Sequence, residues 1–335
     1  MQLRDIIQGQ WNAWRALKRV PDFALTPFQG VAIQFVAGFW WSIAIRHSVV
    51  ARILIVVGDR MASRGIRPRL YLDWFENQPL DKGMQIAFSY PGSSTETVAV
   101  RQYFPAENVV SFFSSSGEVA RGVVRRVNWA CGRRTAELFA RHDLSGIYRA
   151  VPALRYSHLY TEQEPLPAGD QLVLFLTSGL DESLTILNLV FARIEQSLAH
   201  FDSIRVKTHQ ALKTDIVTLA NKRWPQIRNL AVTWENGASS ELLQSAALVL
   251  TAGSSVAIEA LCRGVPVVLT GRTAGLDVNP LEDIDSDAWR SAYSPEDFAS
   301  LLKNWLPGLP PIAERRAAGL KLRAEYFEPV TEDGM

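Results

Sequence analysis

The sequence predicts an α/β protein whose second half forms a parallel, doubly wound sheet. After residue 170, short apolar runs typical of strands alternate with helical segments at the spacing of βαβ units. A composition of 47% hydrophobic and 21% charged residues is that of a globular protein, which excludes disordered, collagen-like and coiled-coil chains. A length of 335 residues suits two domains of ordinary size.

A polar segment with two prolines and a glycine, residues 161–170 (TEQEPLPAGD), predicts the linker between these domains. We therefore expect an abbreviated, helix-rich acceptor-side lobe over residues 1–160. A nucleotide-binding lobe should follow over residues 171–310, and a C-terminal helix and tail over residues 311–335. The charges divide similarly, with a net charge of +8 over residues 1–150 and −7 over residues 151–335, although the whole chain carries only +1.

Strand signals are few in the first half. Residues 71–75 follow a proline and predict a strand, and residues 109–113 predict another. Residues 121–141 contain six arginines and predict a helix with a solvated charged face, or else an electropositive surface for anionic lipid. Residues 28–45 carry no charge, which favours a buried helix pair or a helix on a membrane surface over a membrane span.

The second half shows a regular pattern. Ser294 and Pro295 predict the start of a late helix, with the serine as its N-cap. A helix that ends at Gly264 precedes the last of the predicted strands. The predicted strands are residues 171–176, 203–209, 230–234, 248–251 and 265–269, and the predicted helices are residues 181–199, 212–223, 240–246 and 255–263. Because ligands bind beyond the carboxyl ends of strands in an open parallel sheet, these ends are where we expect the site.

The strand over residues 248–251 ends in residues suited to a phosphate. Gly253 permits a tight turn, and Ser254 and Ser255 precede a helix whose free N–H groups and dipole favour an anion. The same serines would also serve as ordinary helix caps. Glu259 lies one turn later, where its carboxylate would accept hydrogen bonds from ribose hydroxyls or face solvent.

The strand over residues 203–209 ends in basic residues. Alternation places Lys207 and His209 on the same side, with His209 at the strand terminus. There the imidazole would donate to a phosphate oxygen as a leaving nucleotide gains charge. A lone histidine is otherwise more often structural.

These residues resemble the C-terminal, nucleotide-binding half of GT-B glycosyltransferases, over residues 171–282. The closest resemblance is to bacterial sialyl- and Kdo-transferases and to the glycerophosphate polymerases of teichoic-acid synthesis, which use cytidine-activated donors. These families share a basic strand ending in histidine, here Lys207 and His209. They also share two serines before a helix reading E-A-L-x-x-G-V-P-V, here Ser254 and Ser255 with residues 259–267. The resemblance implies a GT-B-like fold of two Rossmann-like lobes, of which the N-terminal one is abbreviated and helix-rich. It also implies that the serines and His209 hold the donor phosphate and that Glu259 binds the ribose. Gln210 stands where the family usually has proline.

Residues 71–83 (YLDWFENQPLDKG) resemble the W-[YF]-E-N-Q motif of bacterial surface-carbohydrate biosynthesis proteins, and residues 151–156 (VPALRY) resemble their G-P-A-L-R segment. Residues 84–150 show little family pattern. Glu76 would follow a strand, where it would deprotonate an acceptor hydroxyl or be an ordinary carboxylate at a helix start. Asn77 and Gln78 would orient the acceptor sugar, and Asp73 is the reserve candidate.

Together these features predict a metal-independent glycosyltransferase, since no His or Asp cluster has ligand spacing. It would move a sugar from a nucleotide-activated, CMP-linked donor to a cell-surface polysaccharide or glycolipid, with no cofactor besides this substrate. One alternative is a CDP-glycerol-type polyol-phosphate transferase, and another is a non-catalytic scaffold of a surface-polysaccharide assembly complex. A sugar-nucleotide 2-epimerase ranks lower, because the first half shows no clear second nucleotide-type lobe.

Two cysteines and the lack of a signal-peptide pattern in the first 20 residues lead us to expect a cytoplasmic protein. Its basic half suggests peripheral contact with the inner face of the inner membrane. The near-neutral total charge does not indicate a nucleic-acid partner.

Overall fold

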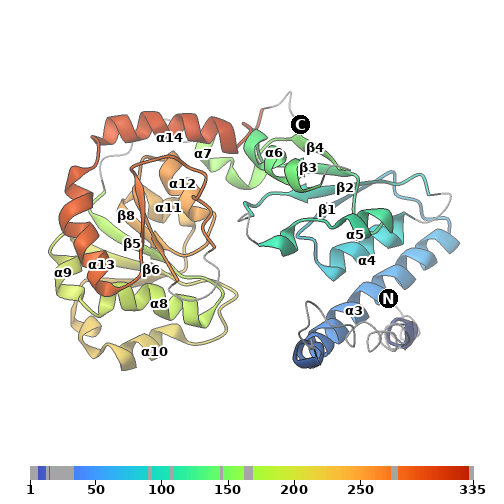
Figure 1. Ribbon diagram of the computed structural model, residues 1–335, viewed down its shortest axis with the longest axis horizontal. Coiled ribbons are helices and arrows are strands. Elements are labelled where there is room, and N and C mark those ends of the chain that lie inside the picture. The colour runs from blue at the N-terminus through green and yellow to red at the C-terminus, as the bar shows by residue number, and fades with distance from the viewer. Residues whose placement is uncertain are drawn as a thin grey trace. The chain divides into compact units, whose positions relative to one another are not determined.

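In the computed structural model the chain divides into two compact units, each described here by itself (Figure 1). Unit 1 comprises Met1–Gln102 and Val110–Val151, and unit 2 comprises Tyr103–Val109 and Pro152–Met335. The structure describes residues 7–12, 15, 34–89, 93–105, 109–143, 146–161, 169–272 and 278–331, without the side chains of residues 34–48 and 110. Residues 28–33 and most of the predicted linker, residues 162–168, lie outside the described residues.

Unit 1 is built on a parallel sheet with the strand order β1-β2-β3-β4. Parallel strands added in one direction by right-handed crossovers place their connecting helices on the same face of the sheet. The long helix α3 packs on α4, the first of these helices. In chain order the elements are α3 (Gln34–Ser63), β1 (Leu70–Trp74), α4 (Pro79–Phe88), β2 (Glu96–Arg101), the 3-10 turn η1 (Val110–Phe112), α5 (Ser116–Ala120), β3 (Val127–Ala130), α6 (Arg133–His142) and β4 (Ile147–Ala150).

Unit 1 both confirms and corrects the sequence analysis. The strand predicted over residues 71–75 is confirmed as β1. The strand predicted over residues 109–113 is wrong, because η1 is a 3-10 turn. The single helix predicted over residues 121–141 is also wrong, since this segment holds β3 and α6. The arginines suggested one solvated charged face, but Arg125 is buried at 1% exposure, whereas Arg126 beside it is exposed.

Unit 2 contains a six-stranded parallel sheet with the order β10-β9-β8-β5-β6-β7. Its elements are η2 (Leu154–Tyr156), α7 (His158–Thr161), β5 (Gln171–Phe175), α8 (Leu180–Phe191), α9 (Ile194–Leu198), β6 (Ser203–Lys207), α10 (Ile216–Arg223), η3 (Pro225–Asn229), β7 (Val232–Glu235), α11 (Ser239–Gln244), β8 (Ala246–Thr251), α12 (Val256–Cys262), β9 (Val267–Thr270), β10 (Trp289–Ala292), α13 (Pro295–Ser300), the π-helical turn η4 (Leu301–Trp305), η5 (Leu306–Gly308) and α14 (Ile312–Tyr326).

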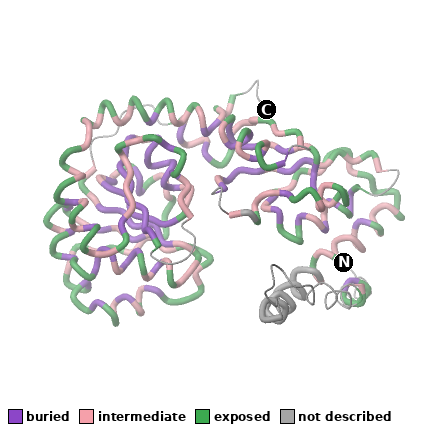
Figure 2. Tube along the Cα trace, in the orientation of Figure 1, coloured by how far each residue is buried: buried purple, intermediate pink, exposed green. Residues whose placement is uncertain are grey.

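The core of unit 2 lies around the central strands, which are coloured as buried in Figure 2. Apolar side chains of β5, β6 and β8 pack against those of α8, among them Leu172, Val206, Leu250 and Ile186. Strands buried on both faces read as nearly continuous apolar runs, which is why the sequence analysis found them. The five strands predicted in this half are confirmed as β5 to β9, with small shifts at their ends.

Four further details of unit 2 bear on the predictions. The helix predicted over residues 181–199 is interrupted at Arg193 and forms α8 and α9. The N-cap prediction is confirmed, since Ser294 Oγ accepts the N–H of Asp297 at 3.1 Å and Pro295 begins α13. Gly264 ends α12 with a φ of +75°, which a β-carbon disfavours. The sequence analysis did not predict the edge strand β10.

None of the helices in the described part of the chain combines the length and apolar character needed to cross a lipid bilayer.

Candidate functional site

The strand order of unit 2 creates a switch point between β5 and β8. From β5 the chain proceeds to β6 and β7 on one side, and then returns to β8 on the other side of β5. The connections that leave β5 and β8 therefore diverge, and ligands of doubly wound sheets bind in the crevice this opens at the carboxyl ends of the strands. Each of these two strands is followed by a turn of small residues and then by a helix.

The turn after β5 contains Thr177, Ser178 and Gly179 and leads into α8. Thr177 Oγ1 accepts the N–H of Gly179 at 3.3 Å and donates to Glu182 Oε2 at 2.9 Å. Ser183 Oγ donates to the carbonyl of Thr177 at 3.0 Å. These hydrogen bonds join the connection after β5 to the first turn of α8. The free N–H groups at the start of this 12-residue helix can bind an anion. Sequence analysis missed this turn, although its small-residue pattern directly after an apolar strand could have revealed it.

The turn after β8 is anchored by a buried threonine. Thr251 Oγ1 donates to the carbonyl of Phe175 at 3.0 Å, which ties the end of β8 to the end of β5. Ser254 Oγ accepts the N–H of Val256 at 3.4 Å, whereas Ser255, the N-cap of α12, makes no side-chain capping bond. The structure thus brings the two predicted serines to the switch point, and one of the two does not act as an ordinary cap.

Gly253 allows the turn after β8 to pass close to another segment. A β-carbon at this position would lie 2.7 Å from both Val278 O and Val278 Cγ1, closer than carbon atoms approach. Gly253→Ala is therefore expected to destabilise unit 2 by about 1–3 kcal/mol in chemical denaturation, through overpacking. Gly308→Ala is the matched control, because no atom lies within 4 Å of its added carbon. Equal stability of the two variants would contradict this close approach.

The predicted basic residues lie at the end of β6, on the other side of β5 from β8. Lys207 Nζ donates to the carbonyl of Gly237. His209 is exposed, and its Nδ1 accepts the N–H of Ala211 at 3.1 Å, which leaves the proton on Nε2 in the neutral ring. Two strand spacings separate β6 from β8, so these ends lie about 10 Å apart. A nucleotide is long enough to span that distance.

Two further polar contacts involve Glu259 and the segment after β9. Glu259 is buried, and its Oε2 lies 3.0 Å from His158 Nε2, so the solvent-facing alternative for this residue is wrong. Arg272 follows β9 and pairs with Glu182 at the start of α8, beside the switch point. Sequence analysis missed Arg272, whose signal is a cation directly after the glycine that follows a buried strand.

In unit 1, Glu76 lies just beyond the carboxyl end of β1. Trp74 Nε1 donates to Glu76 Oε1 at 2.8 Å, and Gln78 Nε2 donates to Glu76 Oε2 at 3.0 Å. Each carboxylate oxygen thus accepts one hydrogen bond from another residue of the same motif. This contact orients the carboxylate, and it places Gln78 beside Glu76 as predicted.

The backbone around Glu76 is held by two other residues of the motif. Asp81 Oδ2 accepts the N–H groups of Glu76 and Gln78, each at 2.9 Å. Asn77 adopts a left-handed φ of +62°, and its Nδ2 donates to the carbonyls of Ser111 at 3.1 Å and Phe113 at 2.9 Å. The Asn77 side chain is buried, so this amide fixes the loop that carries Glu76.

Asp73, the reserve candidate, belongs to a buried network. Its Oδ2 lies 2.7 Å from Arg125, whose side chain is fully buried between the rings of Tyr71 and Phe75. Burial raises the pKa of Asp73, while Arg125 acts in the opposite direction. Burial and the Asp73 carboxylate together raise the pKa of Tyr71 to about 12. The structure thus gives Asp73 a protein partner on the helix-covered face of the sheet.

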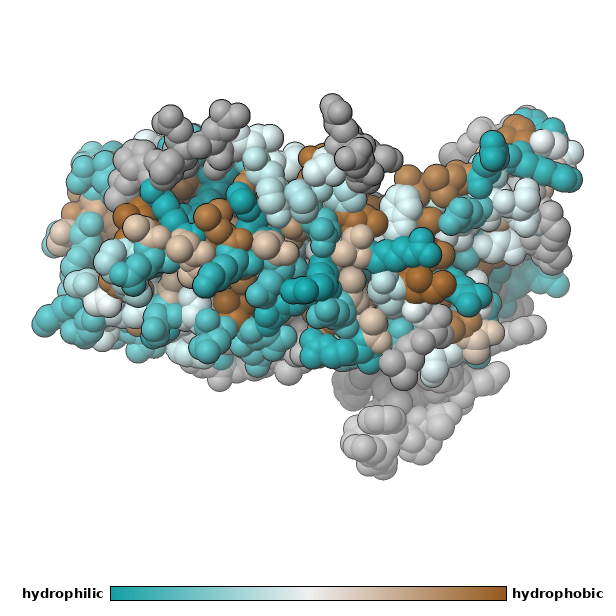
Figure 3. All heavy atoms as spheres, turned by 90° about the horizontal axis from the view of Figure 1, so that it is seen from above, coloured by the Kyte–Doolittle hydropathy of each residue, from teal (hydrophilic) through white to brown (hydrophobic). Residues whose placement is uncertain are grey.

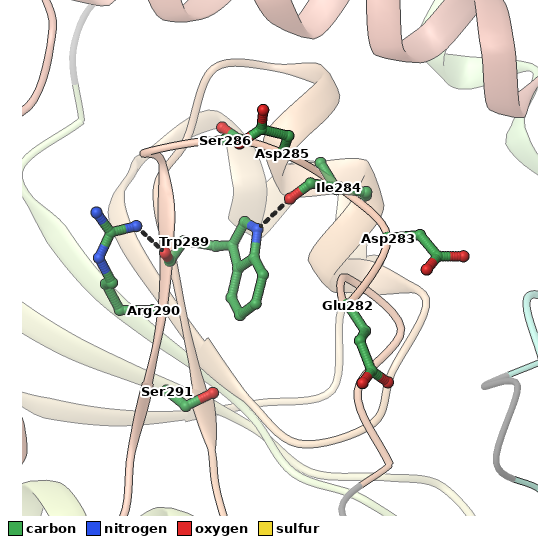
Figure 4. Close-up of a pocket in the computed structure, with 8 residues that line it drawn as sticks. All are labelled: Glu282, Asp283, Ile284, Asp285, Ser286, Trp289, Arg290 and Ser291. Atoms are coloured by element: carbon green, nitrogen blue, oxygen red, sulfur yellow. Dashed lines mark hydrogen bonds between the residues drawn. The ribbon is translucent and has the colours of Figure 1, made fainter.

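A separate hollow of about 420 Å³ lies beside β10 (Figure 4). Its lining includes three acidic residues, Glu282, Asp283 and Asp285, together with Arg290 and Trp289. Trp289 Nε1 donates to the carbonyl of Ile284 at 2.8 Å. None of the predicted site residues contributes to this hollow. In the described part of the chain, no group of three or more His, Cys, Asp or Glu side chains is arranged to hold a metal ion.

Comparison with known proteins finds no matching family model and no matching curated sequence. Solved structures do resemble the chain. The structure of S. aureus MnaA in complex with UDP is 11% identical in sequence, with a TM-score of 0.57. The match covers 84% of this chain and 78% of the MnaA chain. A structure assigned as a UDP-N-acetylglucosamine 2-epimerase from Listeria monocytogenes is 13% identical with a TM-score of 0.55, covering 84% and 75%. A glycosyltransferase from Rickettsia africae is 8% identical with a TM-score of 0.51, covering 83% and 77%. The likeness shows that this chain has the GT-B fold, with two Rossmann-like lobes.

Proposed function

We propose that the protein is a glycosyltransferase that uses a nucleotide-activated, CMP-linked sugar and a cell-surface polysaccharide or glycolipid acceptor. One observation carries this proposal: the switch point of unit 2 is flanked by two strand–turn–helix connections of small, hydroxyl-bearing residues. Such connections bind phosphate through backbone N–H groups and the helix dipole. The likeness of the fold to a UDP-bound structure supports a nucleotide-activated donor.

On the donor side, the N–H groups and hydroxyls of Ser254 and Ser255 hold the donor phosphate. Lys207 and the Nε2 proton of His209 neutralise the charge that the phosphate gains when the sugar departs. Glu259, oriented by His158, accepts a hydrogen bond from a ribose hydroxyl. Because cationic side chains supply this charge stabilisation, the reaction needs no metal ion.

On the acceptor side, Glu76 removes the proton from the attacking hydroxyl. The hydroxyl oxygen forms a bond to the anomeric carbon, and the bond from that carbon to the phosphate oxygen breaks. The nucleotide leaves with the bonding electron pair, and the proton stays on Glu76. Gln78 orients the acceptor sugar, while Asn77 and Asp81 hold the backbone that carries Glu76. A membrane-linked acceptor places the protein at the cytoplasmic face of the inner membrane, as a peripheral protein.

Thermal unfolding in the presence of CMP, CDP, UDP and GDP tests the donor assignment. A ligand at 100 times its dissociation constant stabilises the folded state by about 2.7 kcal/mol, so a cytidine nucleotide is expected to raise the melting temperature most. The double variant Ser254→Ala with Ser255→Ala is expected to lose this shift. Ser239→Ala with Ser240→Ala is the matched control, since these serines also begin a helix, α11, which follows edge strand β7. A response to UDP alone would contradict the cytidine assignment, and no response to any nucleotide would favour the scaffold alternative.

A second candidate is a sugar-nucleotide 2-epimerase. Sequence analysis ranked it lower because the first half showed no clear second nucleotide-type lobe, and unit 1 has a sheet of four parallel strands in its described part. One similar structure is assigned as such an epimerase. Product analysis distinguishes the candidates. An epimerase converts the nucleotide sugar without acceptor, a sugar transferase leaves CMP, and a polyol-phosphate transferase moves a phosphate from CDP-glycerol to the acceptor.

A further inference from the structure

The sheet of unit 1 has one face without a covering helix in the described part of the chain. Tyr71 and Tyr148 point to the face where α4 and α6 pack, as their ring contacts with Phe88 and Phe139 show. Alternation along the strands sends the neighbouring residues to the opposite face. The strand registers align them in rows across the sheet. We call this second side the open face, and its apolar side chains include Leu70, Leu72, Trp74, Val100, Trp129 and Ile147.

The open face exposes large apolar side chains. The exposed fractions are 47% for Leu70 and Leu72, 43% for Trp74 and 37% for Ile147. Val98 of the central strand β2, which lies on the open face in register with Leu72, is fully buried, so the strongly exposed apolar side chains are those of the edge strands β1 and β4. Parallel sheets are normally buried on both faces, and contiguous exposed apolar surfaces of this kind mark sites of interaction.

Cations lie on the open face and in the loop at one end of it. Arg149 lies on it, in register with Trp129 across β3 and β4. The loop that precedes β1 carries the exposed arginines Arg64 and Arg67, together with Ile66 at 49% exposure. Within the described strands of this sheet, Glu96 is the acidic residue on the open face. This surface therefore combines apolar and aromatic side chains with a cationic border.

We propose that the open face docks on a membrane surface that contains anionic lipids. Leucine and tryptophan side chains enter the boundary between headgroups and acyl chains, and arginines at the border bind the lipid phosphates. A second copy of the chain is a poorer occupant, because face-to-face association would bring two arginine borders together. Figure 3 shows hydrophobic and hydrophilic side chains side by side on the face of the molecule seen from above.

This surface differs from the one the sequence suggested. The arginine-rich residues 121–141 do not form a single cationic helix, and Arg125 is buried. The side chains of the uncharged stretch up to residue 45 are outside the described residues. Membrane docking needs neither donor nor acceptor sugar, so it is testable whether or not the protein transfers sugars.

Flotation of the full chain with lipid vesicles tests the proposal. We expect binding to vesicles of phosphatidylcholine mixed with phosphatidylglycerol, weaker binding to phosphatidylcholine alone, and loss of binding with added salt. Arg67→Glu with Arg149→Glu is expected to reduce binding at least about 30-fold, because each arginine near an anionic surface contributes about fivefold. Arg228→Glu, at an exposed arginine of unit 2, is the control and should bind as wild type. Equal binding of both variants, or no binding by the wild type, would overturn the proposal.

A labelled cysteine provides a second test that leaves the folded core unchanged. Cys131 and Cys262 are buried, so a thiol-reactive, polarity-sensitive fluorophore will select Leu72→Cys on the open face. Its emission should shift to the blue with anionic vesicles. The same label at Leu320→Cys, an exposed position of α14, should not respond. No shift at position 72, or a shift that rises with protein concentration without lipid, would overturn membrane docking, and the latter would indicate a dimer.

Discussion

Replacing Arg125 with methionine is expected to lower the free energy of unfolding of unit 1 by about 3–5 kcal/mol, the usual cost of removing one partner from a buried ion pair. The change leaves Asp73 without its cation at 2.7 Å. It also removes the hydrogen bond from Arg125 to the carbonyl of Asp81, at 3.2 Å, and two cation–π contacts. Chemical denaturation measures the total loss, and hydrogen exchange of peptides from β1 and β3 assigns it to unit 1.

Arg126→Met is the matched control for this prediction. Arg126 is the next residue in the chain and is exposed, so its loss should change stability by no more than about 0.5 kcal/mol. If both variants unfold at the same denaturant concentration, the buried ion pair does not stabilise the sheet as described.

The cost of Arg125→Met should also depend on pH. Burial raises the pKa of Asp73, and Arg125 opposes this effect, so its removal raises the pKa further. An acid whose pKa is raised on folding costs no stability while it is protonated in both states, and it destabilises the folded state once the pH exceeds its pKa in the unfolded chain. The deficit should therefore be smallest below about pH 4, the ordinary pKa of aspartate, and grow as the pH rises. A deficit that grows towards acid would contradict this account.

Replacing Glu76 with glutamine is expected to lower kcat for sugar transfer by about 10²- to 10⁴-fold, the usual contribution of a general base. Glutamine keeps the size of the side chain and still accepts from Trp74 Nε1, but it cannot take the acceptor proton. Nucleotide binding, read as the thermal shift described above, should stay unchanged because Ser254 and Ser255 belong to unit 2.

Glu137→Gln is the control for this change. Glu137 is an exposed carboxylate in α6 of the same unit, where it lies 3.9 Å from Arg133. It should transfer sugar at the wild-type rate. His209→Ala tests the leaving-group side separately. The proposed mechanism fails if Glu76→Gln and His209→Ala both retain the wild-type rate with every cytidine-activated donor.

Local sequence patterns identified some residues of the candidate site and missed the partners of others. Ser254, Ser255 and Gly253 were found from the sequence because a buried strand, a small-residue turn and a helix follow one another within a short segment. The partner of Glu259 could not be found in this way, since His158 lies 101 residues away. The pairing of Arg272 was missed because its partner, Glu182, lies 90 residues earlier in the chain.

The motif around Glu76 shows the same limit. Sequence analysis placed Glu76 after a strand and Gln78 beside it, and both placements agree with the structure. It treated Asn77 as a residue that contacts the sugar, whereas its amide donates to two carbonyls of the segment around η1. A short motif does not reveal whether a polar side chain faces a ligand or its own fold.

By itself, the sequence determined the α/β class, the parallel sheet of unit 2 and the position of the two serines. It did so because strands buried on both faces are continuous apolar runs between turn residues. Only the tertiary structure decided which segments form the parallel sheet of unit 1, that Arg125 is buried and that one face of that sheet is open. Its strands are short, and the cation that looked solvated is neutralised by Asp73, 52 residues away. Burial of a charge depends on such distant partners, and local periodicity does not contain them.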